Sequence, residues 1–197
     1  LAFRQDFRTV GKLFKSEEDE EELIKKWLDL TSFFQSKRFY ALVLVALPVF
    51  NIAMLVLMGL GFINWSLFLL VMMLNLTLVG TRLKTFNIHY NLLNKSHTNL
   101  KKMAKLFNQV EKLNVESDLL LELQEQLFSS RQSASLQINK LTRLLDALDN
   151  RSNILVGFVL NALLLWDWNC LWRIEKWQHA HQLDYENWQN TIANFDA

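Results

Sequence analysis

The chain has 197 residues, of which 51% are hydrophobic and 21% charged, and this balance excludes a generally disordered protein. The 21 Lys and Arg residues against 20 Asp and Glu residues give a net charge of +1, which favours neither nucleic acid nor an acidic partner. Five glycines and one proline are too few turn-forming residues for a β-sandwich or barrel, so we expect an all-α fold.

Three regions follow one another along the chain: an N-terminal helical part (1–38), a hydrophobic hairpin (39–81) and a helical region (82–197). The chain begins with a leucine rather than a methionine and ends within a helical pattern. We therefore interpret it as a segment of a longer protein. In the first region Ser16 precedes six acidic residues. A serine can cap a helix, and acids are stabilised at its positive end, so this pattern predicts a helix over 16–35.

The second region contains no charged residue between Arg38 and Arg82, and its main strongly polar side chains are Asn51 and Asn75. A membrane-spanning helix needs about 20 predominantly apolar residues. Residues 40–60 supply this length, and residues 64–80 nearly do. The sequence therefore predicts a hairpin of two transmembrane helices.

Basic residues flank this hairpin on both sides, with Lys37 and Arg38 before it and Arg82 and Lys84 after it. Because positive residues favour the cytoplasmic side, both chain ends are expected in the cytoplasm and the turn outside. The expected location is the cytoplasmic membrane. The alternative is a cytoplasmic protein in which the hairpin is a buried part of a large soluble core.

The third region begins with apolar residues that alternate by four and three, as in a coiled coil. These residues are Phe86, Tyr90, Leu93, His97, Leu100, Ala104 and Phe107. With no helix breaker before them, one helix is expected from about residue 64 to 113. Three lysines in this stretch, Lys101, Lys102 and Lys105, are weak candidates for contacts with DNA or lipid phosphates. Shorter helices follow, with a restart at 114–117, a break at 129–130 and a cap at Asn150 or Ser152.

The last segment has apolar residues every three or four positions from Val159 to Phe195, and this period predicts one long helix over 152–196. No charge occurs from Ser152 to Trp166. This part is short for a third membrane segment, so a deeply buried helix start is the favoured interpretation.

No motif for catalysis is present, and we expect no catalytic, cofactor or metal site in this chain. The P-loop and Rossmann glycine patterns are absent. The single Cys170 excludes an internal disulfide framework and fits a reducing compartment. His179 and His181 point in different directions on a helix and cannot share one metal ion. Glu175 with His179, or His181 with Asp184, would supply only two ligands. A group of five tryptophans near the end of the chain is expected to pack rather than to stack on bases: Trp166, Trp168, Trp172, Trp177 and Trp188.

Residues 145–177 read LDALDNRSNILVGFVLNALLLWDWNCLWRIEKW. This segment resembles the core, or lever, domain (domain III) of MutS-like proteins that carry membrane segments, a branch of the DNA mismatch repair MutS family. The N-terminal LAFRQDFRTVGKLFKSEEDEEELIKKWL is similar, more loosely, to the start of the same domain. The match covers about the last sixty residues most clearly, and its landmarks are Asn, Asp and Trp within hydrophobic patterns.

The resemblance implies a non-enzymatic lever that couples an ATPase domain in the parent chain to DNA or another partner at the membrane. ATP and Mg²⁺ are then ligands of the parent chain, which is expected to be a homodimer. No ATP-binding residue carries over to this sequence, and the hydrophobic hairpin departs from classical mismatch-repair proteins. Two alternatives are a membrane-tethered coiled-coil scaffold or signal-transmission module without ATPase, and a soluble helical interaction domain.

Overall fold

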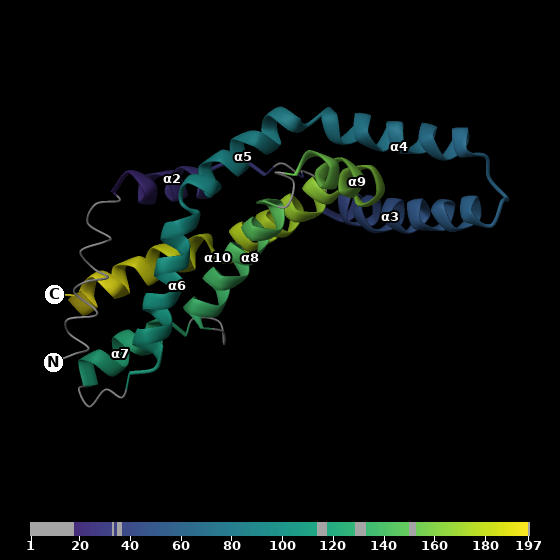
Figure 1. The fold of residues 1–197 in the computed structure, drawn as a ribbon. Helices are drawn as coiled ribbons and strands as arrows, with labels where there is room; N and C mark the ends of the chain where they lie inside the picture. The colour runs from purple at the N-terminus through teal and green to yellow at the C-terminus, as the bar shows by residue number, and fades with distance from the viewer. Residues whose placement is uncertain are drawn as a thin grey trace. The chain divides into compact units, whose positions relative to one another are not determined.

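The computed structural model describes residues 18–32, 34, 37–113, 118–128, 133–149 and 153–196 (Figure 1). Within these ranges the regular elements are α-helices and no strand occurs, which confirms the all-α fold class. The helices are α2 (Glu18–Leu28), α3 (Lys37–Gly59), α4 (Trp65–Gly80), α5 (Leu83–Lys95), α6 (His97–Glu111), α7 (Asp118–Gln126), α8 (Ala134–Asp149), α9 (Ile154–Leu164) and α10 (Trp166–Asp196).

The chain divides into two compact units, each assembled from segments that are far apart in the sequence. Unit 1 comprises residues 1–30, 91–145 and 177–197, and unit 2 comprises residues 31–90 and 146–176. Helices α5, α8 and α10 contribute residues to both units.

In unit 1, the C-terminal part of α10 contacts three other helices through its tryptophans. Trp177 packs on Trp27 of α2, with ring centroids 6.3 Å apart, and its indole nitrogen donates to the carbonyl of Gln137 in α8 at 2.8 Å. Trp188 lies edge-on against Phe107 of α6, at 6.4 Å. The apolar stripe predicted for this helix therefore forms core contacts in unit 1.

In the same unit, side-chain amides donate hydrogen bonds to the carbonyls at the ends of two helices. The Nδ or Nε groups of asparagine and glutamine can satisfy carbonyls that have no partner within their own helix. Gln178, which is buried, donates to three carbonyls at the end of α2, at 2.9 to 3.2 Å. Gln124 donates to three carbonyls at the end of α6, at 2.8 to 3.1 Å. Asparagine side chains bond the end of a helix in the same way in unit 2.

Unit 2 contains the hydrophobic hairpin. Helices α3 and α4 coincide with the two predicted apolar segments, and residues 60–64 form the turn between them, where Gly61 has a φ of +83°. Helix α9 packs against both helices (Figure 1). Buried Met54, Phe68, Met72 and Ala162 bring the three helices together.

The continuous helix expected over 64–113 is wrong, because the structure has three helices there. Helices α4 and α5 meet at an angle of 60° across Thr81 and Arg82. The hydroxyl of Thr81 donates to the carbonyl of Leu78 at 2.7 Å, and this local bond competes with helix continuation. Ser96, which is fully buried, separates α5 from α6.

The single long helix expected over 152–196 is also wrong. Leu165 adopts the left-handed conformation, with φ 48°, and helices α9 and α10 meet there at 78°. A leucine is strained in this region of φ/ψ space. Its side chain is fully buried and its amide still donates to the carbonyl of Asn161 at 3.2 Å, so tertiary packing stabilises the break.

Several predicted features lie outside the described residues. They are the helix cap at Ser16, the helix restart at 114–117, the break at Ser129 and Ser130, and the caps at Asn150 and Ser152.

Candidate membrane-interaction region

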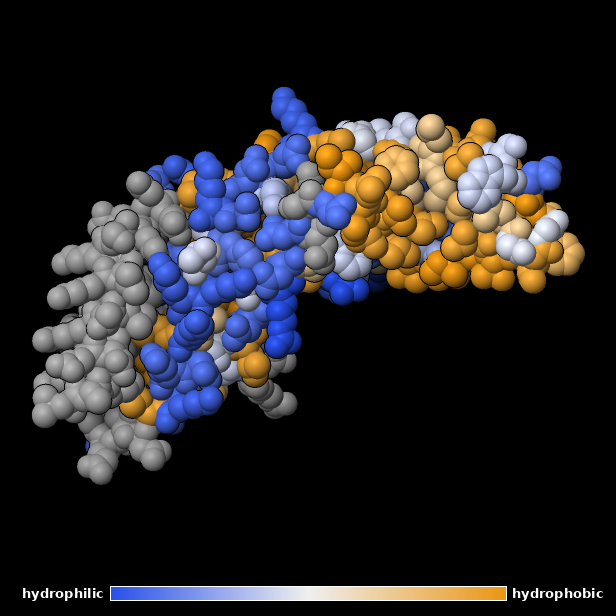
Figure 2. Space-filling model, viewed as in Figure 1, coloured by the Kyte–Doolittle hydropathy of each residue, from blue (hydrophilic) through white to orange (hydrophobic). Residues whose placement is uncertain are grey.

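Helices α3 and α4 expose large apolar side chains on most of their surface. On α3, Leu42, Val45 and Val49 are 68%, 66% and 62% exposed, and on α4 Met73 and Leu74 are 68% and 61% exposed. Figure 2 shows hydrophobic residues gathered over these helices and α9. Soluble monomers rarely expose contiguous apolar patches of more than a few hundred Å². This surface therefore needs an apolar partner.

One helix in the described residues, Arg38–Gly59, is long and apolar enough by itself to cross a membrane. Its 22 residues correspond to about 33 Å, and 17% of its most apolar 18-residue stretch is buried within the protein. Helix α4 is shorter, at about 24 Å. Up to three spans result if the bent pairs α4 with α5 and α9 with α10 each count as one.

Two asparagines of the hairpin helices, Asn51 and Asn75, are buried, and both donate to the C-terminal end of α9. The Nδ2 atom of Asn51 donates to the carbonyl of Leu163 at 2.8 Å, and Nδ2 of Asn75 donates to the carbonyl of Ala162 at 3.0 Å. The last carbonyls of a helix have no partner within it. The hairpin therefore satisfies two polar groups that α9 would otherwise leave unbonded in an apolar environment.

A third asparagine, Asn169 in α10, completes this arrangement. Its Nδ2 atom donates to the carbonyl of Leu164 at 2.8 Å and lies 3.4 Å from the carbonyl of Leu44 in α3. Pro48, four residues after Leu44, has no N–H group and cannot bond that carbonyl. Asn169 therefore donates both to a carbonyl at the end of α9 and to the carbonyl of α3 that Pro48 leaves without a helical donor.

Asn161 fixes the break between α9 and α10. Its Nδ2 atom donates to the carbonyl of Gly157 at 3.1 Å, and its Oδ1 atom accepts from the backbone N–H of Asp167 at 2.9 Å. Asn161 and Asn169 carry no distinguishing signal in the sequence, because each is one polar residue among apolar ones. Their role depends on contacts that the fold creates.

The first part of α9 is not buried, in contrast to the prediction of a deeply buried helix start. Ile154 and Leu155 are 84% and 78% exposed, and Phe158 and Val159 are about half exposed. The predicted basic flanks lie away from the turn: Lys37 and Arg38 begin α3, Arg82 follows α4, and Lys84 lies in the first turn of α5. Arg38, Arg82 and Lys84 are exposed.

The other residues considered in the sequence analysis are the three lysines of α6 and the candidate metal-ligand pairs. Lys101, Lys102 and Lys105 lie on α6, with Lys101 and Lys105 exposed. His181 and Asp184 are joined by a bond of 3.1 Å. Glu175 is buried and accepts from the Ser32 hydroxyl and the Phe34 backbone N–H, at 2.9 and 3.2 Å, while His179 is exposed.

Burial raises the pKa of the Cys170 thiol to about 12, so this group is a poor nucleophile. Trp168, Trp177 and Trp188, three of the five tryptophans, are buried.

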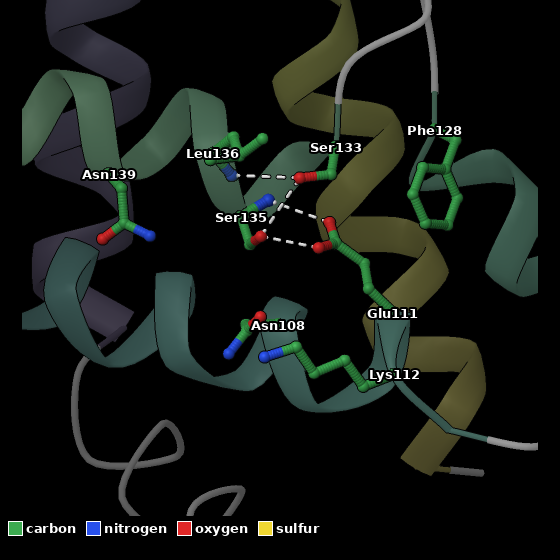
Figure 3. Close-up of a pocket in the computed structure, with 8 residues that line it drawn as sticks. All are labelled: Asn108, Glu111, Lys112, Phe128, Ser133, Ser135, Leu136 and Asn139. Carbon is green, nitrogen blue, oxygen red and sulfur yellow. Dashed lines mark hydrogen bonds between the residues drawn. The ribbon is translucent and has the colours of Figure 1, made fainter.

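A pocket in unit 1 lies at the start of α8, and the residues that cap this helix are among those that line the pocket (Figure 3). The carboxylate of Glu111 accepts from the Ser135 N–H at 2.9 Å and from its hydroxyl at 2.6 Å. The Ser133 hydroxyl accepts from the Leu136 N–H at 3.3 Å. This helix start is therefore occupied by a carboxylate of the same chain, which makes the pocket a weak candidate for an anion.

No family model, curated protein or solved structure matches this chain. The resemblance to the core domain of MutS-like proteins therefore rests on the sequence motifs alone and stays a prediction.

Proposed function

We propose that this chain is a membrane-anchored, non-enzymatic helical module in which α3 and α4 cross the bilayer as a hairpin. We further propose that it is the lever segment of a MutS-like ATPase and couples nucleotide state in the parent chain to DNA or another partner at the membrane. In this proposal ATP and Mg²⁺ bind to the parent chain, which acts as a homodimer.

One observation carries the membrane part of the proposal: the exposed surface of the hairpin helices is largely apolar, whereas two asparagines are among their buried residues. Its large exposed side chains are aliphatic or aromatic, whereas Asn51 and Asn75 are buried and donate to backbone carbonyls. In a bilayer, polar groups must be satisfied within the protein, and polar side chains face the bundle interior. A helix at a water-exposed surface carries polar and charged residues on its outer face instead.

Both alternatives fit this surface less well. A soluble interaction domain requires residues 39–81 to be core, but Leu42, Val49 and Met73 are more than half exposed. A coiled-coil scaffold requires its seam to face another chain, but Leu93 and Leu100 are buried within this one. The seam residues are therefore already occupied by intramolecular contacts.

The lever part of the proposal is supported by the sequence motifs and by α10. This helix has 31 residues, about 46 Å, and it contributes residues to both compact units. A long uninterrupted helix can transmit a displacement between distant parts of a protein. The segment that we quote for the resemblance, 145–177, contains α9 and the start of α10.

The membrane proposal is tested by flotation of the full chain with phosphatidylcholine vesicles, followed by alkaline carbonate washing. We expect the wild-type chain to stay with the vesicles. Val49→Arg should reduce this fraction, because an arginine near the middle of a span costs about 2.5 to 3.5 kcal/mol. Leu183→Arg is the matched control, since Leu183 is 79% exposed on α10 and outside the hairpin. Release of the wild type by carbonate would overturn the membrane proposal.

The lever proposal is tested separately, by sequencing the coding region that continues from Ala197. A glycine-rich P-loop ending in Lys-Ser or Lys-Thr within about one or two hundred residues is expected. An unrelated continuation would remove the ATPase coupling and leave the membrane anchor untouched.

A further inference from the structure

Helix α9 presents an apolar face that no described residue covers. Ile154, Leu155, Phe158 and Val159 follow the spacing of one helix face and are 84%, 78%, 57% and 51% exposed. No charged residue occurs between Asn153 and Trp166. A helix of this composition is unusual at a water-exposed surface.

The bonds to Asn51 and Asn75 fix the level of the C-terminal end of α9 along the hairpin. Asn51 precedes Gly59 by eight residues, and Asn75 follows Trp65 by ten, so they lie about 12 and 15 Å from the turn. The hydrocarbon core of a bilayer is about 30 Å thick. If the turn lies at the outer surface, α9 ends near the middle of the bilayer.

The length of α9 then limits where its other end lies. Its 11 residues correspond to about 16 Å. Whatever its direction, no part of the helix is more than about 31 Å from the level of the turn, the sum of about 15 and 16 Å. If the hairpin spans the bilayer with its turn at the outer surface, the whole helix therefore lies at or within the boundary of the hydrocarbon region.

The backbone of α9 is suited to this environment. Its last three carbonyls, those of Ala162, Leu163 and Leu164, accept from asparagines of α4, α3 and α10. At the other end, the Oδ1 atom of Asn153 accepts from the N–H groups of Leu155 and Val156 at 3.2 and 3.3 Å. Unbonded backbone groups are what excludes a broken helix from lipid, and five of those at the two ends of α9 are bonded within the protein.

We propose that α9 is a third membrane-inserted helix, which lies beside the α3–α4 hairpin and has its exposed face covered by lipid acyl chains. This inference rests on the proposed insertion of the hairpin. Acyl chains are the occupant that fits, because the face of α9 joins the apolar surface of the hairpin (Figure 2) and carries no charge that a protein partner would pair with. The membrane region is then a three-helix bundle in which asparagines of α3 and α4 donate hydrogen bonds to α9.

The test places a fluorescent probe on α9 and measures its contact with lipid. Leu155→Cys and Phe158→Cys are labelled with an NBD maleimide in the full chain and reconstituted into phosphatidylcholine vesicles that contain doxyl-labelled acyl chains. Val49→Cys on α3 is the reference for the hairpin, and Leu183→Cys on α10 is the reference for water. The native Cys170 should not label, because burial raises its pKa to about 12.

We expect the probes at 155 and 158 to be quenched as strongly as the probe at 49, with the same blue shift of emission. If they behave like the probe at 183 while the probe at 49 is quenched, α9 is outside the lipid and the inference fails, but the membrane hairpin stands. If the probe at 49 is not quenched either, both the inference and the proposed membrane anchor are wrong.

Discussion

Asparagine is the residue type that distinguishes unit 2 from an ordinary apolar bundle. Asn51, Asn75 and Asn169 come from three helices, and each donates to a carbonyl at the end of α9. A buried amide without a partner costs a few kcal/mol, so such residues persist where their bonds are made. These three side chains therefore locate the end of α9 as well as stabilise it.

The bond from Asn75 gives the first prediction. Asn75→Leu should lower the stability of the protein in detergent by about 0.6 to 2 kcal/mol, since polar bonds between transmembrane helices have this size. The carbonyl of Ala162 loses its donor, while the leucine keeps the volume. Thermal unfolding followed by circular dichroism measures the change.

Thr77→Val is the control for Asn75→Leu. Thr77 lies on the same helix, but it is exposed, and its hydroxyl donates to the carbonyl of Met73 in its own helix at 2.8 Å. We expect this variant to unfold close to the wild-type temperature. Equal effects of the two substitutions would contradict the role of Asn75 as a bond between helices.

His89 gives a second prediction, on pH dependence. It is 2% exposed on α5, and burial lowers its pKa below the ordinary value of 6.5. The unfolded chain therefore binds this proton more readily than the folded one, so acidification below about pH 6.5 should reduce the free energy of unfolding. The melting temperature of the wild type should fall more between pH 7.5 and 5.5 than that of His89→Gln. Parallel decreases in the two proteins would show that His89 contributes nothing to the acid sensitivity.

At the scale of helices, the sequence predicted the existence of the elements better than their ends. The hairpin helices were predictable because an uncharged stretch of this length has few other structures. The break at Leu165 was not, because a leucine continues the apolar period of a helix and the residues that stabilise its left-handed conformation come from the fold. The breaks near Thr81 and Ser96 had only a weak local signal, a hydroxyl that bonds the preceding turn.

The turn of the hairpin gives a third prediction. Gly61 has a φ of +83°, which costs a residue with a Cβ roughly 1 kcal/mol, so Gly61→Ala should destabilise the protein by about that amount. Gly59 is the matched control, because it ends α3 with nothing within 4 Å of an added Cβ. Gly59→Ala should be neutral or slightly stabilising, since alanine favours helix. Unfolding in detergent distinguishes the two, and a larger loss from Gly59→Ala would contradict the observed turn.

At the scale of the whole molecule, the candidate site was predictable only in its outline. The basic flanks and the apolar length are local features of the sequence. The bonds of Asn51 and Asn75 to α9 join residues that are 112 and 87 positions apart, and no local pattern predicts such pairs. Composition thus predicts that this region prefers lipid, whereas the fold determines how its polar groups are accommodated there.

The orientation of the hairpin gives the last prediction, because the flanking charges favour one side of the membrane. Lys37, Arg38, Arg82 and Lys84 should hold both hairpin ends in the cytoplasm and the turn outside. In intact cells, a membrane-impermeant maleimide should label Phe62→Cys in the turn, which is 77% exposed, and should leave Lys84→Cys unlabelled until the cells are lysed. Labelling of Lys84→Cys before lysis would reverse the orientation, and labelling of neither residue in cells with equal labelling after lysis would indicate that the turn does not reach the outer surface. The first of these results would place both ends of the hairpin, and the partners proposed for the segments that adjoin them, outside the cytoplasm.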